Sequence, residues 1–77
     1  MLFAEIRVVT AGNRLVRFQW KGGWYAVTSV EDEWVDTGEW WHEEGEKTFY
    51  RVSSGTSVFE LYFDAKEKGW YMYRVYD

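Results

Sequence analysis

Chemically reactive side chains are scarce in this sequence. It has no cysteine and a single histidine, His42, so thiolate and multi-histidine metal sites are excluded. No glycine-rich loop leads into a helix, and no serine, histidine and acid are arranged as a catalytic triad. His42 and the adjacent Glu43 and Glu44 would need a loop to converge on a cation, because neighbouring strand residues face opposite ways. We therefore expect no enzymatic activity, no cofactor and no metal.

Carboxylates are concentrated in one segment of the chain. Residues 31–46 contain eight acids and no lysine or arginine, whereas the rest of the chain has five acids and nine bases. General acid–base catalysis needs one desolvated carboxyl group, which a run of exposed acids does not supply. The segment is interpreted as an electrostatic surface for a partner or as an exposed connection kept soluble by its charge.

Three tryptophans lie within this acidic segment: Trp34, Trp40 and Trp41. Exposed tryptophans flanked by charge are typical anchors of protein interfaces. In so small a domain the same side chains can instead fold back over the core and seal it. Under the hypothesis of a protein partner, these three residues are the contact site.

A second candidate surface combines cations with an aromatic ring. Arg17, Lys21 and Trp24 share the outer face of an expected hairpin, which suits stacked bases and phosphates of single-stranded nucleic acid. Alternatively, Trp24 covers one end of the fold and the cations keep it solvated. A comparable group around Arg51, Glu60 and Arg74 is better interpreted as cross-strand charge pairing, since Glu60 would cancel much of the positive field.

Alternating apolar side chains predict strands as the elements that position these residues. The expected strands cover residues 2–9, 15–20, 24–30, 47–53, 56–63 and 70–76. Residues 29–41 fit either a strand that runs to Trp34 or one turn of helix. Two-residue hairpin turns are expected at Gly22-Gly23 and Ser54-Gly55. They would place Trp20 opposite Tyr25, and Tyr50 opposite Phe59.

These hairpins predict which side chains form the core. The expected buried residues are Phe18, Trp20, Tyr25, Val27, Tyr50, Val52, Phe59 and Leu61. Seventeen aromatic residues in 77 supply the apolar area that a short chain without disulfides needs. Residues 1–77 are thus expected to form a single all-β domain, a small closed or nearly closed antiparallel barrel of about six short strands, SH3-like or similar, without a long helix.

The spacing of several motifs resembles a small bacterial domain that occurs fused to, or encoded beside, ImuB-like Y-family translesion DNA polymerases. The resemblance covers residues 15–77 and rests on Phe18-x-Trp20-x-Gly22-x-x-Tyr25-x-Val27, Trp34, Trp40-Trp41, Tyr50-Arg51-Val52, Glu60-Leu61-Tyr62, Trp70 and Arg74-Val75-Tyr76-Asp77. That domain brings no catalytic residues with it. Its members are often basic, and the acidic segment of this chain departs from them. The resemblance implies a setting in translesion synthesis or DNA repair.

The sequence therefore predicts a non-enzymatic adaptor that binds a protein, with a polymerase or its accessory as the implied partner. The alternative is a weak single-stranded nucleic-acid binder that uses the Arg17, Lys21 and Trp24 face. No stretch has the length and apolarity of a membrane span, and no signal-peptide pattern occurs. We accordingly expect a cytoplasmic protein without a membrane partner.

Overall fold

The computed structural model describes residues 4–36 and 46–76 of the chain. Within these ranges it contains seven antiparallel strands and no helix. The strands are β1 (Ala4–Ala11), β2 (Arg14–Trp20), β3 (Gly23–Ala26), β4 (Ser29–Asp36), β5 (Lys47–Ser54), β6 (Ser57–Asp64) and β7 (Gly69–Tyr76). The predicted all-β architecture is confirmed, with seven strands in place of about six.

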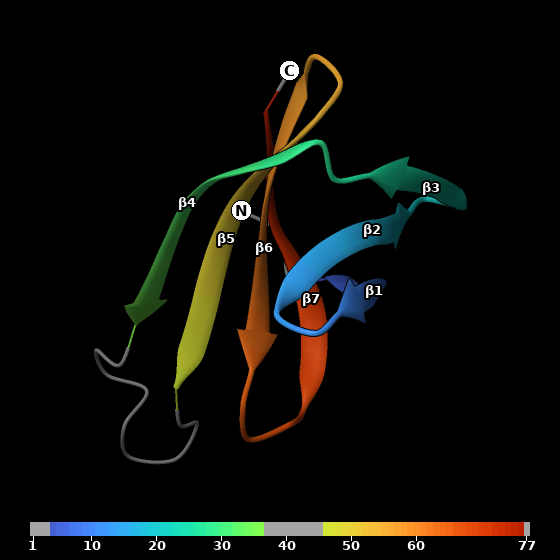
Figure 1. Ribbon diagram of the computed structural model, residues 1–77. Helices are drawn as coiled ribbons and strands as arrows, with labels where there is room; N and C mark the ends of the chain where they lie inside the picture. The colour runs from blue at the N-terminus through green and yellow to red at the C-terminus, as the bar shows by residue number, and fades with distance from the viewer. Residues whose placement is uncertain (1–3, 37–45, 77) are drawn as a thin grey trace.

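All seven strands belong to one sheet in the order β3-β2-β1-β7-β6-β5-β4, which curls into a half-barrel (Figure 1). The additional strand arises because the predicted strand over residues 24–30 breaks at Val27 and Thr28. These two residues cross from one end of the sheet to the other: the Val27 amide donates to the Val16 carbonyl at 2.9 Å, and the Thr28 amide to the Ser53 carbonyl at 2.8 Å. The crossing brings the two sheet edges together at one end, so the barrel is nearly closed there.

The first predicted hairpin is correct, but its turn lies one residue earlier than expected. Lys21 and Gly22 occupy the turn with φ values of 51° and 82°, the pattern of a type I′ turn. Phe18 therefore pairs with Tyr25 and not with Val27. The pairing has shifted by two residues, which leaves Phe18, Trp20 and Tyr25 on their predicted face.

The second hairpin is displaced in the opposite direction, with its turn one residue later than expected. Its turn residues are Gly55 and Thr56, and Val52 pairs with Phe59 in place of Ser57. Gly55 has a φ of 62°, which suits the first central position of a type II′ turn. In both hairpins the sequence predicts the turn region and the buried face but misses the register.

The core lies on the concave side of the half-barrel. Four of the predicted core residues are fully buried there: Phe18, Val52, Phe59 and Leu61. The other four pack against this cluster but are only half-buried: Trp20, Tyr25, Val27 and Tyr50. The cluster is completed by Ile6 on β1, Leu15 on β2 and Met72 on β7.

Simple alternation fails along β7. Leu61 pairs with Met72 and Glu60 with Arg74, so Tyr73 is an extra residue that forms a β-bulge. The bulge changes which side chains point inward: Val75 joins the core, and Arg74 moves to the convex face. Strict alternation along residues 70–76 would instead place Arg74 on the side of Met72 and Val75 on the side of Tyr71.

Candidate functional site

The β4 strand forms one open edge of the sheet, with its side chains sorted by a bulge. Val30 pairs with Val52 and Asp32 with Arg51, which leaves Glu31 as the extra residue. The Glu31 carboxylate accepts hydrogen bonds from Ser29 Oγ at 2.5 Å and Ser53 Oγ at 2.7 Å. These two bonds, with Ser29 first, hold the pKa of Glu31 below its usual range. The first half of the acidic segment is therefore a strand, and its acids line a sheet edge.

The bulge places three β4 side chains on the concave side of the sheet. Glu33 lies opposite Tyr50, and two exposed valines, Val30 and Val35, flank it at 46% and 54% exposure. Since natural sheets protect open edges with charge, the carboxylates of β4 oppose uncontrolled pairing of this edge with another strand. An apolar strip with one carboxylate at its centre thus faces the hollow of the half-barrel.

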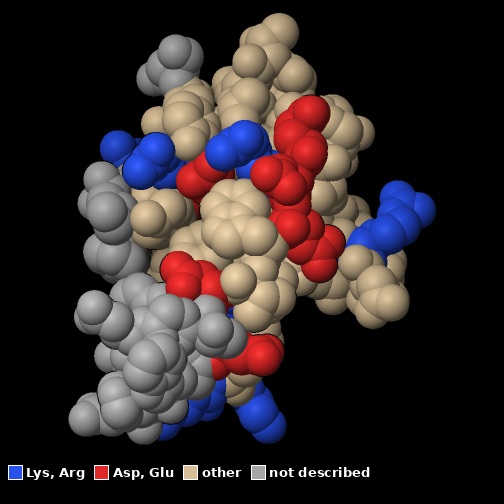
Figure 2. Space-filling model, turned by 90° about the vertical axis from the view of Figure 1, so that its left-hand side faces the viewer, with Lys and Arg blue, Asp and Glu red and all other residues tan. Residues whose placement is uncertain are grey.

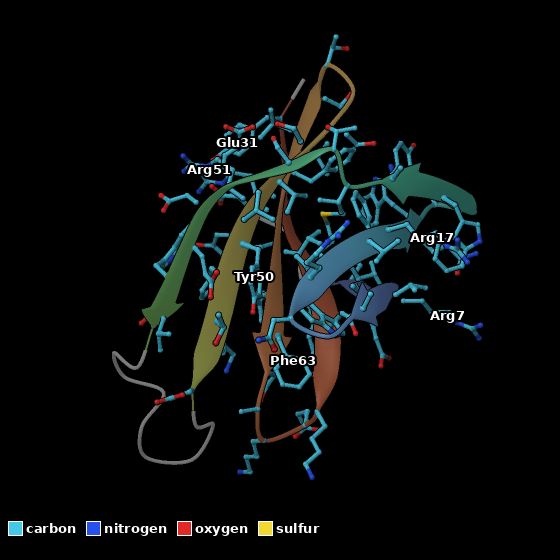
Figure 3. All side chains as sticks on the ribbon, in the orientation of Figure 1. Arg7, Arg17, Glu31, Tyr50, Arg51 and Phe63 are labelled. Carbon is cyan, nitrogen blue, oxygen red and sulfur yellow. The ribbon has the colours of Figure 1, made fainter. Side chains whose placement is uncertain are left out.

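This hollow is a cleft between β4–β5 and the β1–β2 turn. A cavity of about 500 Å³ has Leu15, Tyr50, Phe63 and Trp70 among its lining, with Glu33 also at its wall. Tyr50 and Phe63 both lie within 5.4 Å of Trp70, measured between ring centroids. Figure 3 shows Tyr50 and Phe63 on the side of β5 and β6 that faces the β1–β2 hairpin. The cleft therefore has an aromatic floor and an acidic wall.

Glu33 also changes the electrostatics of the cleft floor. Burial raises the pKa of the Tyr50 hydroxyl, and the negative charge of Glu33 raises it further. Tyr50 therefore remains a neutral hydrogen-bonding group at physiological pH. Among the described residues Glu33 forms no salt bridge. Among the described residues that line the cleft, Glu33 is the only charged one.

Trp34, the first of the predicted partner contacts, packs on the convex face. Its ring stacks on Phe49 at 5.4 Å with an interplanar angle of 4°, and the Arg51 guanidinium lies 5.8 Å from its centroid. The row of rings continues from Phe49 to Tyr62 and then to Tyr71, at 5.2 Å for each step. Trp34 is half-buried at the end of this row, which favours the sealing role. Trp40 and Trp41 lie outside the described residues.

The group around Glu60 is an internal charge network, as the sequence indicates. Glu60 is only 3% exposed and accepts hydrogen bonds from Arg51 Nε at 2.8 Å and from the Tyr76 hydroxyl at 2.9 Å. Arg74 donates to that hydroxyl at 3.3 Å, so it joins the network indirectly. The bond to Glu60 is the main cause that raises the pKa of Arg51. This network ties Arg51 and Tyr76 to the buried Glu60 carboxylate on the convex face.

The predicted basic-aromatic face is only partly assembled. The Arg17 guanidinium lies 5.2 Å from the centroid of Trp24, which is 49% exposed. Lys21, in contrast, sits in the turn with its amine 5.4 Å from the Trp20 ring. Arg7, which sequence reasoning missed, lies opposite Gln19 beside this surface. In Figure 3, Arg7 and Arg17 both lie at the end of the molecule away from β4.

His42 and its neighbouring acids lie outside the described residues. Among the residues that the structure describes, no group of three or more histidine, cysteine or acidic side chains could hold a metal ion. Nor does any helix in the described part have the length and apolarity to cross a membrane.

Residues 8–77 match the sequence model of a family described as Domain of unknown function (DUF6504). The match covers nearly the whole chain, so the protein belongs to this family. No curated protein and no solved structure matches the chain.

Sequence reasoning missed the cleft as a candidate site. The inward position of Tyr50 and Phe63 follows from strand alternation, so the aromatic floor had a sequence basis. The position of Glu33 opposite Tyr50 had no such basis in the sequence, because it depends on the β4–β5 register and on the bulge at Glu31. The aromatic floor and its carboxylate come together only in the folded sheet.

Proposed function

We propose that this domain is a non-enzymatic binding module for a basic segment of a partner protein, which lies along β4 and over the mouth of the cleft. The observation that carries the proposal is an open, carboxylate-lined sheet edge directly beside an aromatic cleft. Clefts of about 300–1,000 Å³ with a few convergent polar groups are the usual form of binding sites. The cleft of about 500 Å³ beside Glu33 falls in this range.

The charge distribution supports a basic partner. Residues 4–28 carry four bases and one acid, whereas β4 carries four acids and no base. These two regions occupy opposite ends of the sheet order. Figure 2, which faces the β4 side, shows acidic side chains around a group of uncharged residues, with basic side chains above them. Such a polarised surface steers a basic segment toward β4 and disfavours its approach to β1–β3.

The contact is made by side chains and does not extend the sheet. The Asp32 carboxylate accepts a hydrogen bond at 2.9 Å from the Glu33 amide, so this backbone donor is already occupied. A strand added to β4 would have to displace this bond. Lysine or arginine side chains that reach Glu33 and Asp36 need no such displacement. In view of the resemblance stated above, translesion polymerases and their accessory proteins are the first candidates for the partner.

The test uses labelled peptides, because the partner itself is not identified. A decapeptide that alternates lysine with leucine and its glutamate counterpart are titrated by fluorescence anisotropy. The lysine peptide is expected to bind, and binding is expected to weaken in the Glu33→Gln/Asp36→Asn variant. The matched control Glu67→Gln removes an exposed acid from the β6–β7 turn and should have little effect. Equal binding of both peptides, or equal loss in the control, would refute the proposal.

A second candidate function rests on the Arg17–Trp24 contact. With Arg7 nearby, this surface offers a stacking ring and two cations to single-stranded nucleic acid. Two phosphate contacts predict that the logarithm of affinity falls against the logarithm of salt concentration with a slope of roughly −1.4. Labelled oligothymidine titrated at two salt concentrations tests this, with Arg7→Gln/Arg17→Gln as the disrupting variant. Absence of binding at low salt would exclude this function.

A further inference from the structure

We infer that the concave cleft is a subsite for a single cationic side chain of the partner, an arginine guanidinium or a lysine ammonium group. This inference deepens the proposed function and depends on it for its biological meaning. It assigns the cleft to a cation in place of an apolar anchor. The assignment follows from the three aromatic rings of the floor and the one carboxylate on the wall.

The rings of the floor offer the surface that cations prefer. The rings of Tyr50 and Phe63 lie 5.4 Å and 5.1 Å from the ring of Trp70, with interplanar angles of 42° and 53°. All three rings line the same cavity. Tryptophan is the strongest of the aromatic partners for a cation, and cages of this kind recognise ammonium groups.

Glu33 supplies the charge that selects a cation over a neutral group. Its carboxylate borders both the main cavity and an adjoining one of about 250 Å³. It lies opposite Tyr50, whose pKa it raises, so its negative field reaches the aromatic floor. A cationic side chain that enters the cleft would place its charged head over the rings and within reach of Glu33. A neutral apolar side chain would leave the carboxylate against an apolar neighbour.

Among the described residues that line the two cavities, Arg14 is the only one with a positive charge, and it lines the smaller cavity. Arg14 is exposed and makes no salt bridge with Glu33 in the described part of the chain. It therefore repels an incoming cation but does not occupy the cleft floor. Removal of the Arg14 charge should therefore raise the affinity of the cleft for a cation, whereas removal of the Glu33 charge should lower it.

The experiment titrates the intact domain with acetyl-arginine amide and with its neutral isostere acetyl-citrulline amide. Binding is followed by NMR through the indole N–H of Trp70. The arginine compound is expected to shift this resonance, and the citrulline compound to bind roughly tenfold more weakly or not at all. Glu33→Gln should weaken arginine binding roughly two- to fivefold. Arg14→Gln should strengthen it.

Two matched variants keep the test independent of folding. Tyr50→Phe retains the ring and should bind arginine nearly normally, whereas Phe63→Leu removes a ring from the floor and should weaken binding. Equal affinity for arginine and citrulline, or weaker binding in Arg14→Gln, would overturn the inference. If the lysine–leucine peptide binds but acetyl-arginine amide leaves Trp70 unchanged, the proposed function stands and the cation subsite is wrong. If only the small cation binds, the cleft assignment stands and the extended β4 contact is wrong.

Discussion

Replacement of Phe18 is expected to be among the most damaging truncations in the core. Phe18 is 0% exposed and joins the two halves of the half-barrel: its ring lies 5.5 Å from that of Tyr25 on β3 and 4.9 Å from that of Phe59 on β6. Phenylalanine-to-alanine changes in cores cost about 3–5 kcal/mol. A domain of 77 residues has a total stability of about 4–12 kcal/mol. Phe18→Ala should therefore remove much or all of the free energy of unfolding.

Trp20 provides the comparison that tests this reasoning. The sequence alone predicts a loss of about 3–5 kcal/mol for Trp20→Ala. Trp20 is only half-buried at the end of β2, so the structure lowers this expectation to about 1.5–2.5 kcal/mol. Phe18→Leu, which keeps most of the volume but loses both ring contacts, should cost about 1–3 kcal/mol.

Urea unfolding followed by circular dichroism measures all three variants on one scale. The expected order of destabilisation is Phe18→Ala first, with Trp20→Ala and Phe18→Leu clearly smaller. A Trp20→Ala loss equal to or larger than that of Phe18→Ala would refute the placement of Phe18 at the junction of the two halves. A cooperatively folded Phe18→Ala protein with near-normal stability would refute it as well.

Three further predictions follow from other parts of the structure. Asp64 is 7% exposed, forms a 3.4 Å ion pair with buried Lys47, and accepts amide hydrogen bonds from Lys66 and Glu67. Asp64→Ala should therefore lower the free energy of unfolding by about 3–5 kcal/mol, and Asp64→Asn should lower it less. Urea unfolding measures both losses. The pKa of Tyr50 is raised above its ordinary 10.0 in the folded protein, so the unfolded chain loses the hydroxyl proton at a lower pH than the folded one. The free energy of unfolding should therefore fall as the pH rises past 10.0. Tyr50→Phe should make that fall shallower in unfolding curves taken across this pH range. EDTA should leave the melting temperature unchanged, and a decrease would point to a metal bound by the chain.

Strand alternation predicts the buried faces of both hairpins but not their registers. A face is set by side-chain parity, so Phe18 and Tyr25 share a side whether the turn begins at Lys21 or at Gly22. The register depends on which two residues accept positive φ. Lysine rarely does so, and the conformation of Lys21 at 51° could not be anticipated from its residue type.

The cleft and the acidic edge depend on features that composition does not encode. The run of acids in residues 31–46 predicts that these side chains are exposed, and the acids of β4 are indeed at the surface. Exposed acids, however, fit a loop and an edge strand equally well. The bulge at Glu31 decides that Glu33 faces Tyr50. Similarly, the predicted strand over residues 24–30 is interrupted at Val27 and Thr28, where no glycine or proline in the sequence indicates a break. Local pattern therefore predicts the core, whereas long-range pairing creates the candidate site.

The β1–β7 junction has a consequence for how the molecule opens. Each half of the sheet, β1–β3 and β4–β7, is a meander in which strands that follow one another in the sequence are paired. In the described part of the chain, β1 and β7 join the halves through three residue pairs: Ala4 with Met72, Glu5 with Tyr71 and Ile6 with Trp70. Contacts so distant along the chain form late and slow the folding of β proteins. Amide hydrogens along this junction are expected to exchange through partial opening before global unfolding. Because Trp70 belongs both to the junction and to the cleft floor, a ligand held in the cleft would slow that exchange and act as a latch between the two halves.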